Sequence, residues 1–535
     1  MKFVIVTGGG ISGVGKGIIS SSAGFLLKFV MGAKVTMVKI DPYFNLDAGT
    51  MNPMEHGECF VLKDGTETDL DLGNYERFLE MDLDQRSSIT SGQIYSQVLN
   101  NERQGTYLGK TVQAIPHITG EIIRRLEQFN EFDYVVIELG GTVGDIESEI
   151  YFEAFKRLTQ IHGRDNFYYI HVAPVIKTTG GELKTKVIQH SVIEINKRGI
   201  FPDYLCLRLP DECNKLPTKL TNKIEFMAKK GLLYSPTCNS VYQVPSILFK
   251  QNIFGLLDNQ VINNTDVFSR FELMGNSNLD KNFKVAIVGK YLHQEKDDSY
   301  SDKSDSYLSV VHALDHACYK IRGTRASKIW IEADQADFAE IIDRCQAVII
   351  TGGFGSRGYE GMINIAKYTR ENDIPTLGLC LGFQVMVIEY LRSLGLDADT
   401  TEKSPQTKFP IIDLQYASVN DQTKGGTLHR GEYMVKSKFS DRLLSERFRH
   451  RYHINNKLLN RIESDDIVFD GYCDDLPDVP TRFYLGSKKF YFGTQAHCEL
   501  NSRLSQPSMF FIQLIESAHS CVLPEPCDLL LHREG

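Results

Sequence analysis

The chain has 535 residues, of which 42% are hydrophobic and 24% are charged, and its net charge is −9. This length exceeds what one hydrophobic core supports, so we expect more than one domain. The acidic balance argues against a nucleic-acid binder, because there is no excess of Lys and Arg to neutralise phosphates. The eleven cysteines include no CxxC pair, which indicates neither a zinc site nor a disulfide framework. No apolar run reaches ~18 residues and no charged leader opens the chain, so we expect a cytoplasmic protein without membrane segments.

The first predicted element is an apolar strand over residues 3–6, which runs into the glycine-rich turn TGGGISGVGKG and then a helix. Such a turn places backbone N–H groups at a helix N-terminus, where a phosphate binds well. Two motifs fit these residues: GxGxxG, typical of dinucleotide turns, and the P-loop GxxxxGK, which starts at Gly10. Lys16 favours the P-loop, because only that motif requires a cation on the phosphates. Gly17 stands where a P-loop has Ser or Thr, so a Mg²⁺ ligand must come from another segment.

Acids and a second lysine follow in the next strands. The predicted strand DYVVIEL carries Glu138 near its carboxyl end, the edge that faces the ligand crevice in open α/β sheets. Beside a bound triphosphate such an acid can hold Mg²⁺, although a strand-end acid can also cap the following turn. The run from Glu67 to Asp71 alternates acids along an extended segment, which suits a metal as well as a solvated loop. Lys39 ends the predicted strand KVTMVKI and would face the same crevice as Lys16.

Apolar strands alternate with helical segments along both halves of the chain, which is typical of α/β folds. Helices are predicted over 20–31 and 118–129, with further strands over 167–172 and 204–209. The rhythm is lost near residue 259 and resumes with strands over 283–288, 347–350 and 376–379. We therefore predict two domains, residues 1–262 and 283–535, each a mainly parallel sheet with flanking helices, and a linker over 263–282. The polar stretch 293–305 is predicted to be a surface loop.

The second half contains the strand–turn–helix segment IPTLGLCLGFQVMVIEYL, in which Gly378 and Gly382 flank Cys380. This G-x-C-x-G is the cysteine form of the strained nucleophile elbow, and a helix N-terminus favours a thiolate. His497 and Glu499 are two residues apart, so in an extended segment both side chains point to one face, as a base and its orienter. The loop TGGFG after the strand AVII is a candidate oxyanion loop. Without a catalytic role, Cys380 would be a buried thiol, His497 a structural histidine and the TGGFG loop an ordinary glycine turn.

With both halves considered, the chain resembles the CTP synthases, two-domain glutamine amidotransferases that aminate UTP. The motifs that carry the resemblance span nearly the whole length, and their order and spacing matter more than any one of them. In the first half they are VTGGGISGVGKG, KIDPYFNLDAGTMNPMEHGE, DGTETDLDLGNYERF, KTVQAIPHIT, GGTVGDIES and GELKTKVIQHSV. In the second half they are VGKY, GGFGSRGYEGM, GLCLGFQ, RHRY and QAHCE.

The resemblance implies a first domain with a P-loop, dethiobiotin-synthetase-like amidoligase fold and a second domain with a class I glutaminase fold. ATP, as co-substrate, would phosphorylate the 4-oxygen of UTP, and ammonia from glutamine would displace the phosphate to give CTP. The resemblance also implies Mg²⁺ as a cofactor, GTP as an allosteric activator and CTP as a feedback inhibitor. A homotetramer is expected, with filaments as a further assembly, and no nucleic acid is expected as a substrate.

Carried over residue by residue, the resemblance assigns the site residues by ligand. The glutaminase triad would be Cys380, His497 and Glu499. ATP would be bound by Gly13, Val14, Gly15, Lys16, Gly17, Ile18, Lys39 and Asp71, and Mg²⁺ by Asp71 and Glu138. UTP, or CTP in its place, would be bound by Ser12, Asp145, Ile146, Glu147, Lys184, Thr185, Lys186, Val187, Ile188, Gln189 and Lys223. Glutamine would be bound by Gly353, Leu381, Gly382, Phe383, Gln384, Glu402 and Arg451, and His56 would lie near the ammonia passage.

The sequence departs from the family pattern in several places. Val187 and Ile188 replace the Pro and Thr of KTKPTQHSV, which removes one side-chain donor to the pyrimidine nucleotide. Cys498 replaces the Pro of the Q-aromatic-H-P-E turn, where Ala496 also replaces the aromatic residue. Thr351 stands where Pro is usual in the oxyanion loop, and the stretch GGTMRLG reads GGTLHRG. Because the triad residues are all present, we predict working but slow glutaminase chemistry.

Two other functions fit parts of the same sequence. One is another ATP-dependent amidotransferase of this architecture, such as a cobyrinate-type amidase, which the nucleotide-site block GELKTK disfavours. The other is a weakened homologue that serves as a polymerising scaffold or nucleotide sensor, which the intact Lys16, Asp71, Glu138 and Cys380 disfavour. The leading hypothesis is a glutamine-hydrolysing CTP synthase of pyrimidine nucleotide biosynthesis.

Overall fold

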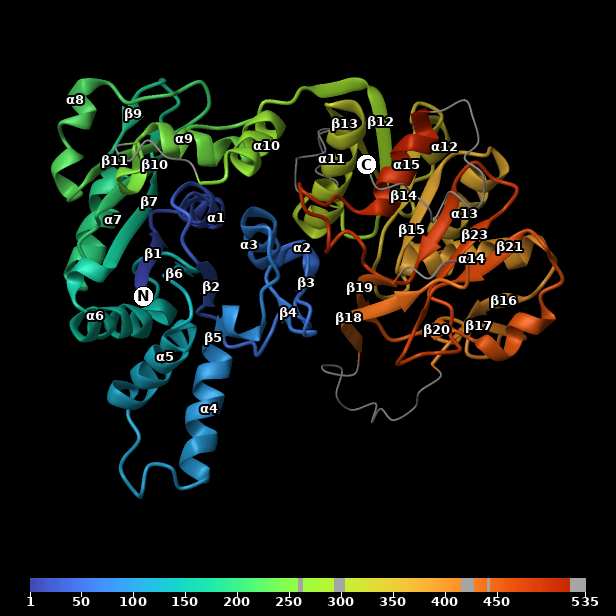
Figure 1. Ribbon diagram of the computed structural model, residues 1–535, viewed down its shortest axis with the longest axis horizontal. Helices are drawn as coiled ribbons and strands as arrows, with labels where there is room; N and C mark the ends of the chain where they lie inside the picture. The colour runs from blue at the N-terminus through green and yellow to red at the C-terminus, as the bar shows by residue number, and fades with distance from the viewer. Residues whose placement is uncertain (258–262, 293–303, 415–427, 440–442, 520–535) are drawn as a thin grey trace. The chain divides into compact units, whose positions relative to one another are not determined.

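The structure is a computed structural model of the chain, and it describes all residues except 258–262, 293–303, 415–427, 440–442 and 520–535. The chain packs into two compact units (Figure 1). The first comprises Met1–Ala48 and Asp71–Asn276, and the second comprises Gly49–Leu70 and Ser277–Gly535. Within the described residues, each unit is built on a seven-stranded, mainly parallel sheet with flanking helices, which confirms the predicted fold class. The boundaries placed at residues 262 and 283 stay predictions.

The sheet of the first unit has the order β11-β10-β7-β1-β6-β2-β5, and its recorded pairings are all parallel. The strands are β1 (Lys2–Gly8), β2 (Val35–Asp41), β5 (Ser88–Thr90), β6 (Tyr134–Leu139), β7 (Phe167–Pro174), β10 (Tyr204–Arg208) and β11 (Gly231–Ser235). β1 lies in the middle, and its residues 3–6 are fully buried because both faces of a parallel sheet are covered by helices. The glycine-rich turn therefore leaves the centre of the sheet at its carboxyl edge.

Helices cover both faces of this sheet. The elements are α1 (Lys16–Phe25), α3 (Asp71–Leu79), α4 (Ser91–Arg103), α5 (Thr119–Leu126), α6 (Glu149–His162), α7 (Lys186–Lys197) and α9 (Val244–Lys250). Phe3 and Ile5 pack in one cluster with apolar side chains of α4, α5 and α6, whereas α1 packs with α3 and α9. In Figure 1, α4 and α5 project together from one end of the sheet. The helix predicted from residue 20 begins earlier, at Lys16, and continues through a π-helical turn over Leu26–Val30.

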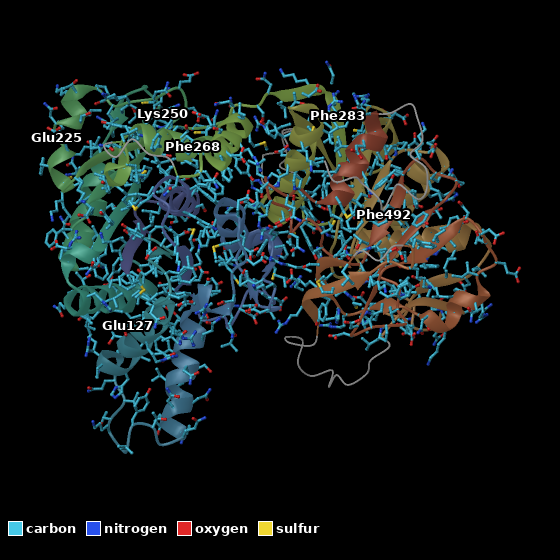
Figure 2. All side chains as sticks on the ribbon, in the orientation of Figure 1. Glu127, Glu225, Lys250, Phe268, Phe283 and Phe492 are labelled. Carbon is cyan, nitrogen blue, oxygen red and sulfur yellow. The ribbon has the colours of Figure 1, made fainter. Side chains whose placement is uncertain are left out.

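The segment predicted as a linker, 263–282, contains regular structure. Helix α10 spans Thr265–Gly275, and Asn264 caps it by accepting a hydrogen bond from the Val267 N–H at 3.2 Å. Phe268 (labelled in Figure 2) and Phe271 are buried on this helix and pack against the ring of Phe25. Abundant Asn and Ser in the flanks conceal the apolar spacing of three residues in this helix, and the linker over 263–282 stays a prediction.

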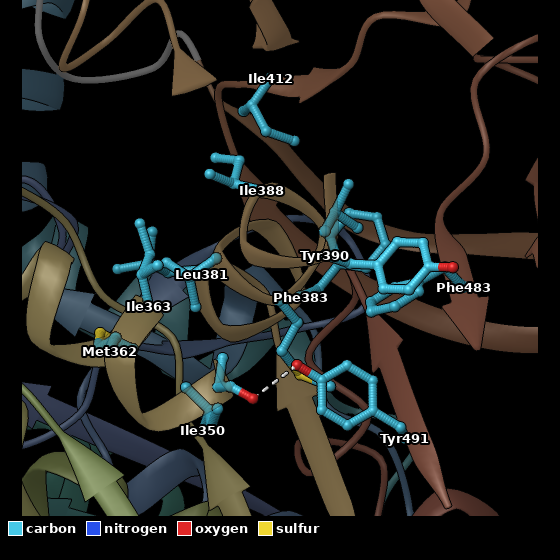
Figure 3. Close-up of a cluster of buried hydrophobic side chains, with 14 of the residues drawn as sticks. Ile350, Met362, Ile363, Leu381, Phe383, Ile388, Tyr390, Ile412, Phe483 and Tyr491 are labelled. Carbon is cyan, nitrogen blue, oxygen red and sulfur yellow. Dashed lines mark hydrogen bonds between the residues drawn. The ribbon is translucent and has the colours of Figure 1, made fainter. Parts of the chain in front are cut away.

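The second unit has the sheet order β13-β12-β14-β15-β24-β23-β21, in which β23 pairs antiparallel with both of its neighbours. Its strands are β12 (Leu279–Gly289), β13 (Arg325–Glu332), β14 (Ala347–Ile350), β15 (Thr376–Leu379), β21 (Ile467–Asp470), β23 (Arg482–Leu485) and β24 (Tyr491–Thr494). Helices α13 (Tyr359–Glu371) and α14 (Leu381–Ser393) pack in one cluster, and α11 (Leu308–Arg322) and α15 (Met509–His519) pack in another with Phe283 and Phe492. Figure 3 shows the α13–α14 cluster, in which the Tyr491 hydroxyl donates to the Ala366 carbonyl at 3.1 Å.

The segment Gly49–Leu70 leaves the first unit and packs with the second, which the sequence did not predict. It contains α2 (Pro53–His56) and the hairpin β3 (Phe60–Val61) and β4 (Glu67–Thr68). Beside it lies a small antiparallel sheet of β18 (His429–Lys436), β19 (Leu443–His450) and β22 (Tyr472–Cys473). The acids from Glu67 to Asp71 therefore do not share one extended face, because Glu67 belongs to this hairpin and Asp71 begins α3.

A second small sheet joins β16 (Ala398–Thr400), β17 (Phe409–Asp413) and β20 (His453–Ile454). Of the polar stretch 293–305, residues 293–303 lie outside the described residues, as do 425–427 of the GGTLHRG stretch. Across the part of the chain that the structure describes, none of the helices combines the length and apolarity that a membrane span requires.

Candidate active sites

Cys380 occupies a strained turn between β15 and α14. Its φ is +52° and its ψ is −100°, a conformation that non-glycine residues rarely adopt. The two neighbouring glycines permit it, since a Cβ on Gly382 would overlap the Ile350 carbonyl and one on Gly378 would lie 2.8 Å from the carbonyl carbon of Gly382. The turn is anchored by the Cys380 N–H, which donates to the Thr494 carbonyl at 2.8 Å. This is the geometry of a nucleophile elbow.

The structure brings His497 and Glu499 to Cys380, as the sequence analysis expects. Nδ1 of His497 lies 2.6 Å from Oε1 of Glu499, and the ring also forms a hydrogen bond with the Cys380 side chain. Burial lowers the pKa of His497, but the charges and hydrogen bonds of Glu499 and Cys380 outweigh it and raise the pKa to about 10. The arrangement thus places a protonated imidazole beside the sulfur of Cys380, and a cysteine attacks a carbonyl carbon as the thiolate.

Gly352 and Gly353 run beside the nucleophile. A Cβ on Gly352 would lie 2.9 Å from Cε1 of His497 and 3.4 Å from Cβ of Cys380, so only glycine fits between them. Thr351, which stands where the family has Pro, is fully buried and bonds the Val288 carbonyl through its N–H (3.1 Å) and its hydroxyl (2.8 Å). Pro could supply neither bond, so this departure anchors the loop in a different way rather than loosening it.

Lys290 of the VGKY motif is a site residue that sequence reasoning missed. It is 1% exposed, and its ammonium donates to the carbonyls of Phe354 (3.1 Å) and Gly355 (2.5 Å). Burial lowers the pKa of Lys290 to about 8. Its two acceptors are 64 and 65 residues away in the sequence, and a lone lysine after a strand carries no signal for such a contact.

The residues assigned to glutamine differ in their surroundings. Gln384 lies in the first turn of α14, where its amide donates to the Gln495 side chain at 3.0 Å and the Tyr452 carbonyl at 3.2 Å. Leu381 and Phe383 instead point into the hydrophobic core (both labelled in Figure 3), so they can act on a ligand only through their backbone. Glu402 is exposed and pairs with Lys403. The remaining members of the assigned set are Gly353, Gly382 and Arg451.

A pocket of about 70 Å³ opens at the thiol. It is lined by Cys380, His497 and the oxyanion loop on one side and by Pro53, Glu58 and Cys59 of the 49–70 segment on another. His56 lies on α2 with half of its side chain exposed and pairs with Glu55. Within the second unit, therefore, the 49–70 segment forms one wall of the space beside the nucleophile.

In the first unit, the glycine-rich turn carries Lys16 into a cluster of charges. The turn has positive φ at Gly13 (+66°) and Gly15 (+92°), and α1 begins directly after Gly15. The Lys16 ammonium donates to the Gly141 carbonyl at 2.8 Å, and burial lowers the pKa of Lys16 although Glu138 opposes this. A glycine-rich turn that leads into a helix and carries a buried lysine at the helix start is the arrangement that binds phosphates.

Asp71 explains the missing Ser or Thr of the P-loop. A Cβ on Gly17 would overlap Oδ1 of Asp71 and lie 2.8 Å from its Cγ. The carboxylate of Asp71 thus occupies the space that the usual side chain would fill. An oxygen ligand for a cation is still present at this point, supplied by the start of α3 rather than by the loop.

Lys39 lies between the acids assigned to Mg²⁺. Its ammonium is 2.5 Å from Oδ2 of Asp71 and 3.4 Å from Oε1 of Glu138, which is its register partner on β6. The Tyr75 hydroxyl donates to the other oxygen of Glu138. Burial raises the pKa of Glu138 and Asp71 adds to it, whereas Lys39 and Lys16 lower it, and the net direction is upward. Two carboxylates beside the glycine-rich turn fit Mg²⁺, which takes one or two protein carboxylates and completes its shell with phosphates and water.

The residues assigned to UTP lie mostly on the surface near this turn. Lys184 pairs with Glu182 at 2.6 Å, and Lys184, Lys223 and Lys219 together hold the pKa of Glu182 below its usual range. This marks a local concentration of positive charge. The first turn of α7 carries the assigned residues Lys186, Val187, Ile188 and Gln189, with Thr185 before it. The remaining assigned residues are Ser12, Asp145, Ile146 and Glu147, of which Asp145 accepts a hydrogen bond from the Thr142 N–H at 2.6 Å.

The two substituted positions of α7 have different surroundings. Ile188 is fully buried in a core cluster with Ala173 and Val192, so its side chain has no access to a ligand. Val187 packs against the phosphate turn, since a Cβ on Gly10 would lie 2.5 Å from its Cγ1. The departures from the family pattern therefore alter the packing behind the site more than its exposed polar groups.

A cysteine elbow in one α/β unit and a phosphate loop in the other define a glutamine-dependent amidoligase. The family model described as the CTP synthase N-terminus matches residues 2–262, and the class I glutamine amidotransferase model matches residues 303–517. The CTP synthase of Pyrococcus furiosus is 40% identical over 536 residues, covering 97% of this chain and 98% of its own length. That of Streptococcus mutans is 40% identical over 543 residues with the same coverage. This chain belongs to the CTP synthase family, the ATP-dependent, glutamine-hydrolysing ligases of pyrimidine biosynthesis.

A solved structure, the glutaminase domain of Trypanosoma brucei CTPS with bound acivicin, aligns with 46% of this chain and 97% of its own. The identity is 24% and the TM-score 0.39, too low to support an argument.

Proposed function

We propose that this chain makes CTP from UTP by two coupled reactions, with each reaction assigned to one unit. In the second unit the Cys380 thiolate attacks the side-chain carbonyl carbon of glutamine, a C–S bond forms, and the C–N bond breaks. His497 supplies the proton with which ammonia leaves, and a water that gives its proton back to His497 hydrolyses the thioester to glutamate. Backbone N–H groups of the loop around Gly353 and of Leu381 would stabilise the oxyanion.

In the first unit the 4-oxygen of UTP attacks the γ-phosphorus of ATP, so that an O–P bond forms and ADP leaves. Ammonia then attacks C4 and phosphate departs with the former 4-oxygen, while the nitrogen gives its surplus protons to solvent. Lys16 and the backbone from Gly13 to Ile18 would hold the phosphates of ATP, with Lys39 at the group in transfer. Asp71 and Glu138 would hold Mg²⁺, which neutralises charge on the phosphates when it is bound.

The triad geometry carries this proposal, because a thiol, an imidazole and a carboxylate in hydrogen-bonded series supply the nucleophile, the base and its orienting group for hydrolysis of the glutamine amide. The cation cluster around Lys184 and Lys223 supports binding of the UTP triphosphate beside α7. CTP would compete there as a feedback inhibitor, and the remaining assigned residues would complete the site. The pocket lined by Cys380, Pro53 and Cys59 supports a passage for ammonia beside the 49–70 segment, which also carries His56.

GTP activation, a homotetramer and filaments follow from the family resemblance and are proposed on that ground. A tetramer is supported by exposed apolar side chains on the first unit, among them Leu99 (61%), Leu108 (88%) and Ile115 (51%), which lie on or near the projecting α4–α5 pair. A cytoplasmic location stays a prediction from the sequence.

The test is chromatographic detection of CTP after incubation with UTP, ATP, Mg²⁺ and glutamine, with and without GTP. CTP is expected with glutamine and, in a parallel reaction, with an ammonium salt. Cys380→Ala should abolish the glutamine reaction and leave the ammonia reaction unchanged. Loss of both reactions in this variant would contradict the division of labour, and a wild-type enzyme that makes no CTP from either nitrogen source would contradict the proposed function.

A further inference from the structure

His171 forms a buried bridge behind the phosphate turn that the reaction as described does not use. It lies on β7 and is fully buried. Its Nδ1 is 2.9 Å from the Thr7 hydroxyl, and its Nε2 is 2.5 Å from the Ser191 hydroxyl. Both ring nitrogens are therefore bonded, each to a group that can either donate or accept, so a neutral imidazole is satisfied in either tautomer.

The bridge joins the two elements to which the proposed function assigns the two nucleotides. Thr7 is the register partner of His171 at the carboxyl end of β1, directly before the glycine-rich turn that holds ATP. Ser191 lies on α7, one turn after the residues assigned to UTP. From this geometry we infer that His171 is a positioning residue, which fixes the phosphate loop against α7 and so sets the distance between the phosphoryl donor and its acceptor.

The packing around the bridge leaves little freedom for either element. A Cβ on Gly9 would overlap the Ser191 hydroxyl, lie 2.9 Å from its Cβ and 3.3 Å from Cε1 of His171. The backbone of the turn thus rests directly on the bridge. The turn is also tied to β7 by the Gly9 N–H, which donates to the Val172 carbonyl at 3.1 Å. A shift of the ring or of Ser191 would therefore move the turn that holds the phosphates.

The ring is held neutral, which suits positioning rather than proton transfer. Burial lowers the pKa of His171 to about 3, and the nearby positive charge of Lys16 acts in the same direction. A charged imidazole would repel the ammonium of Lys16, whereas a neutral ring leaves that ammonium undisturbed. The inference rests on the proposed placement of ATP and UTP and adds a group that holds the two sites in register.

The test uses Thr7→Val, Ser191→Ala and the double variant in the full-length enzyme, with an ammonium salt as the nitrogen source so that glutamine hydrolysis does not contribute. Small misplacements of reacting groups cost up to about 100-fold in rate, so kcat should fall about 10- to 100-fold per folded molecule. The dissociation constant for ATP alone, measured by calorimetry, should change less than about threefold, because the groups that contact it are untouched. Thr159→Val is the matched control, since the Thr159 hydroxyl likewise joins a helix to β7 through the Tyr169 hydroxyl (2.7 Å).

The double variant separates positioning from simple packing. Thr7 and Ser191 act through one ring, so once either bond is lost the ring can turn, and the double variant should be little slower than the slower single variant. Independent packing contributions would instead multiply. His171→Gln, which keeps a donor and an acceptor, should retain about 10-fold more kcat than His171→Leu, since an unpaired buried hydroxyl is costly. Unchanged kcat in the single variants, multiplicative losses, or equal losses in Thr159→Val would each overturn the inference. A wild-type enzyme without ammonia-dependent CTP formation would overturn the proposed function instead.

Discussion

The carboxylate of Glu67 accepts a 2.7 Å hydrogen bond from Nε of Arg449, a residue 382 positions further along the chain. Arg430 donates to the other carboxylate oxygen at 2.5 Å, and the Glu67 side chain is only 3% exposed. The carbonyl of Arg449 lies 3.7 Å from the Cys380 thiol. The 49–70 segment is thus fastened to the strand that supports the nucleophile.

We expect Glu67→Gln to reduce glutaminase turnover about 10-fold or more, because removing one partner of a buried charged pair costs about 3–5 kcal/mol and leaves the arginines to reorient. The ammonia-dependent reaction should change little. Release of ammonia and of CTP, measured with both nitrogen sources, checks this. Glu55→Gln, at a side chain of the same segment that is 71% exposed, is the control. Equal losses with glutamine and ammonia would contradict the expectation.

For Lys16→Ala we expect no CTP formation from either nitrogen source, because the turn loses its buried cation for the phosphates. Hydrolysis of glutamine by Cys380 should continue, which is checked by measuring glutamate release. Lys250→Ala replaces a lysine of the same unit whose side chain is 69% exposed and should behave as wild type. CTP synthesis by Lys16→Ala with ammonia would mean that this turn is not the phosphoryl-transfer site.

Glu499→Gln should make glutamine hydrolysis decline at a lower pH on the alkaline side of its pH profile. In the wild type, Glu499 and Cys380 hold the pKa of His497 at about 10, so the imidazole keeps its proton well above pH 7. Without the carboxylate the pKa of His497 falls and the proton is lost at lower pH. The decline of kcat/KM should therefore move down by about one pH unit or more, measured as ammonia release between pH 6 and 10. The exposed Glu340→Gln has the same charge change. An alkaline limb that stays in place would show that Glu499 does not set this pKa.

Lys290 links activity and stability to pH with opposite signs. Its pKa is lowered to about 8, so the buried charge costs stability below pH 8, and this cost disappears as the pH rises from 8 toward 10.5, the ordinary lysine value. The melting temperature of the wild type minus that of Lys290→Met should therefore rise over this interval. Glutaminase activity should fall around pH 8, below the decline that His497 sets near pH 10, because a neutral amine holds the Phe354 and Gly355 carbonyls less strongly.

Lys290→Met should have a raised KM for glutamine. Its glutaminase activity should not show the fall with rising pH near pH 8 that the wild type shows. Lys281→Met is the control, since it removes an exposed lysine from β12, the strand that Lys290 follows. A melting-temperature difference that stays constant or falls between pH 8 and 10 would contradict the assignment.

Local sequence patterns were sufficient for the elements that carry chemistry. The strands 347–350 and 376–379 were predicted at the bounds observed, because each is a short apolar run with glycine close by, too short for a helix of the usual length. The elbow around Cys380 and the i, i+2 pair of His497 and Glu499 are likewise local motifs, and the chemistry of a thiol nucleophile, which needs a base, predicted that they lie together. Helix α10 was missed because only a few apolar residues mark it among polar flanks.

Other features had no local signal. The apolar residues 60–62 indicate that this segment is buried, but they do not indicate which surface buries it. The packing of the segment with the second unit was therefore not predicted. The contacts of Lys290 and the hydrogen bond from Tyr75 to Glu138 could not be predicted for the same reason. Each joins residues more than sixty positions apart, and one sequence does not show which distant residues come into contact.

The Asp71 carboxylate lies where a side chain on residue 17 would be, so the residues at these two positions constrain each other. A serine at position 17 would displace the carboxylate, and a glycine at 17 without Asp71 would leave no oxygen ligand from either residue. A sequence pattern that demands Ser or Thr after the lysine does not match this loop. A pattern that pairs glycine after the lysine with an aspartate at the start of a later helix matches it, because it follows the position of the oxygen ligand and not its place in the chain.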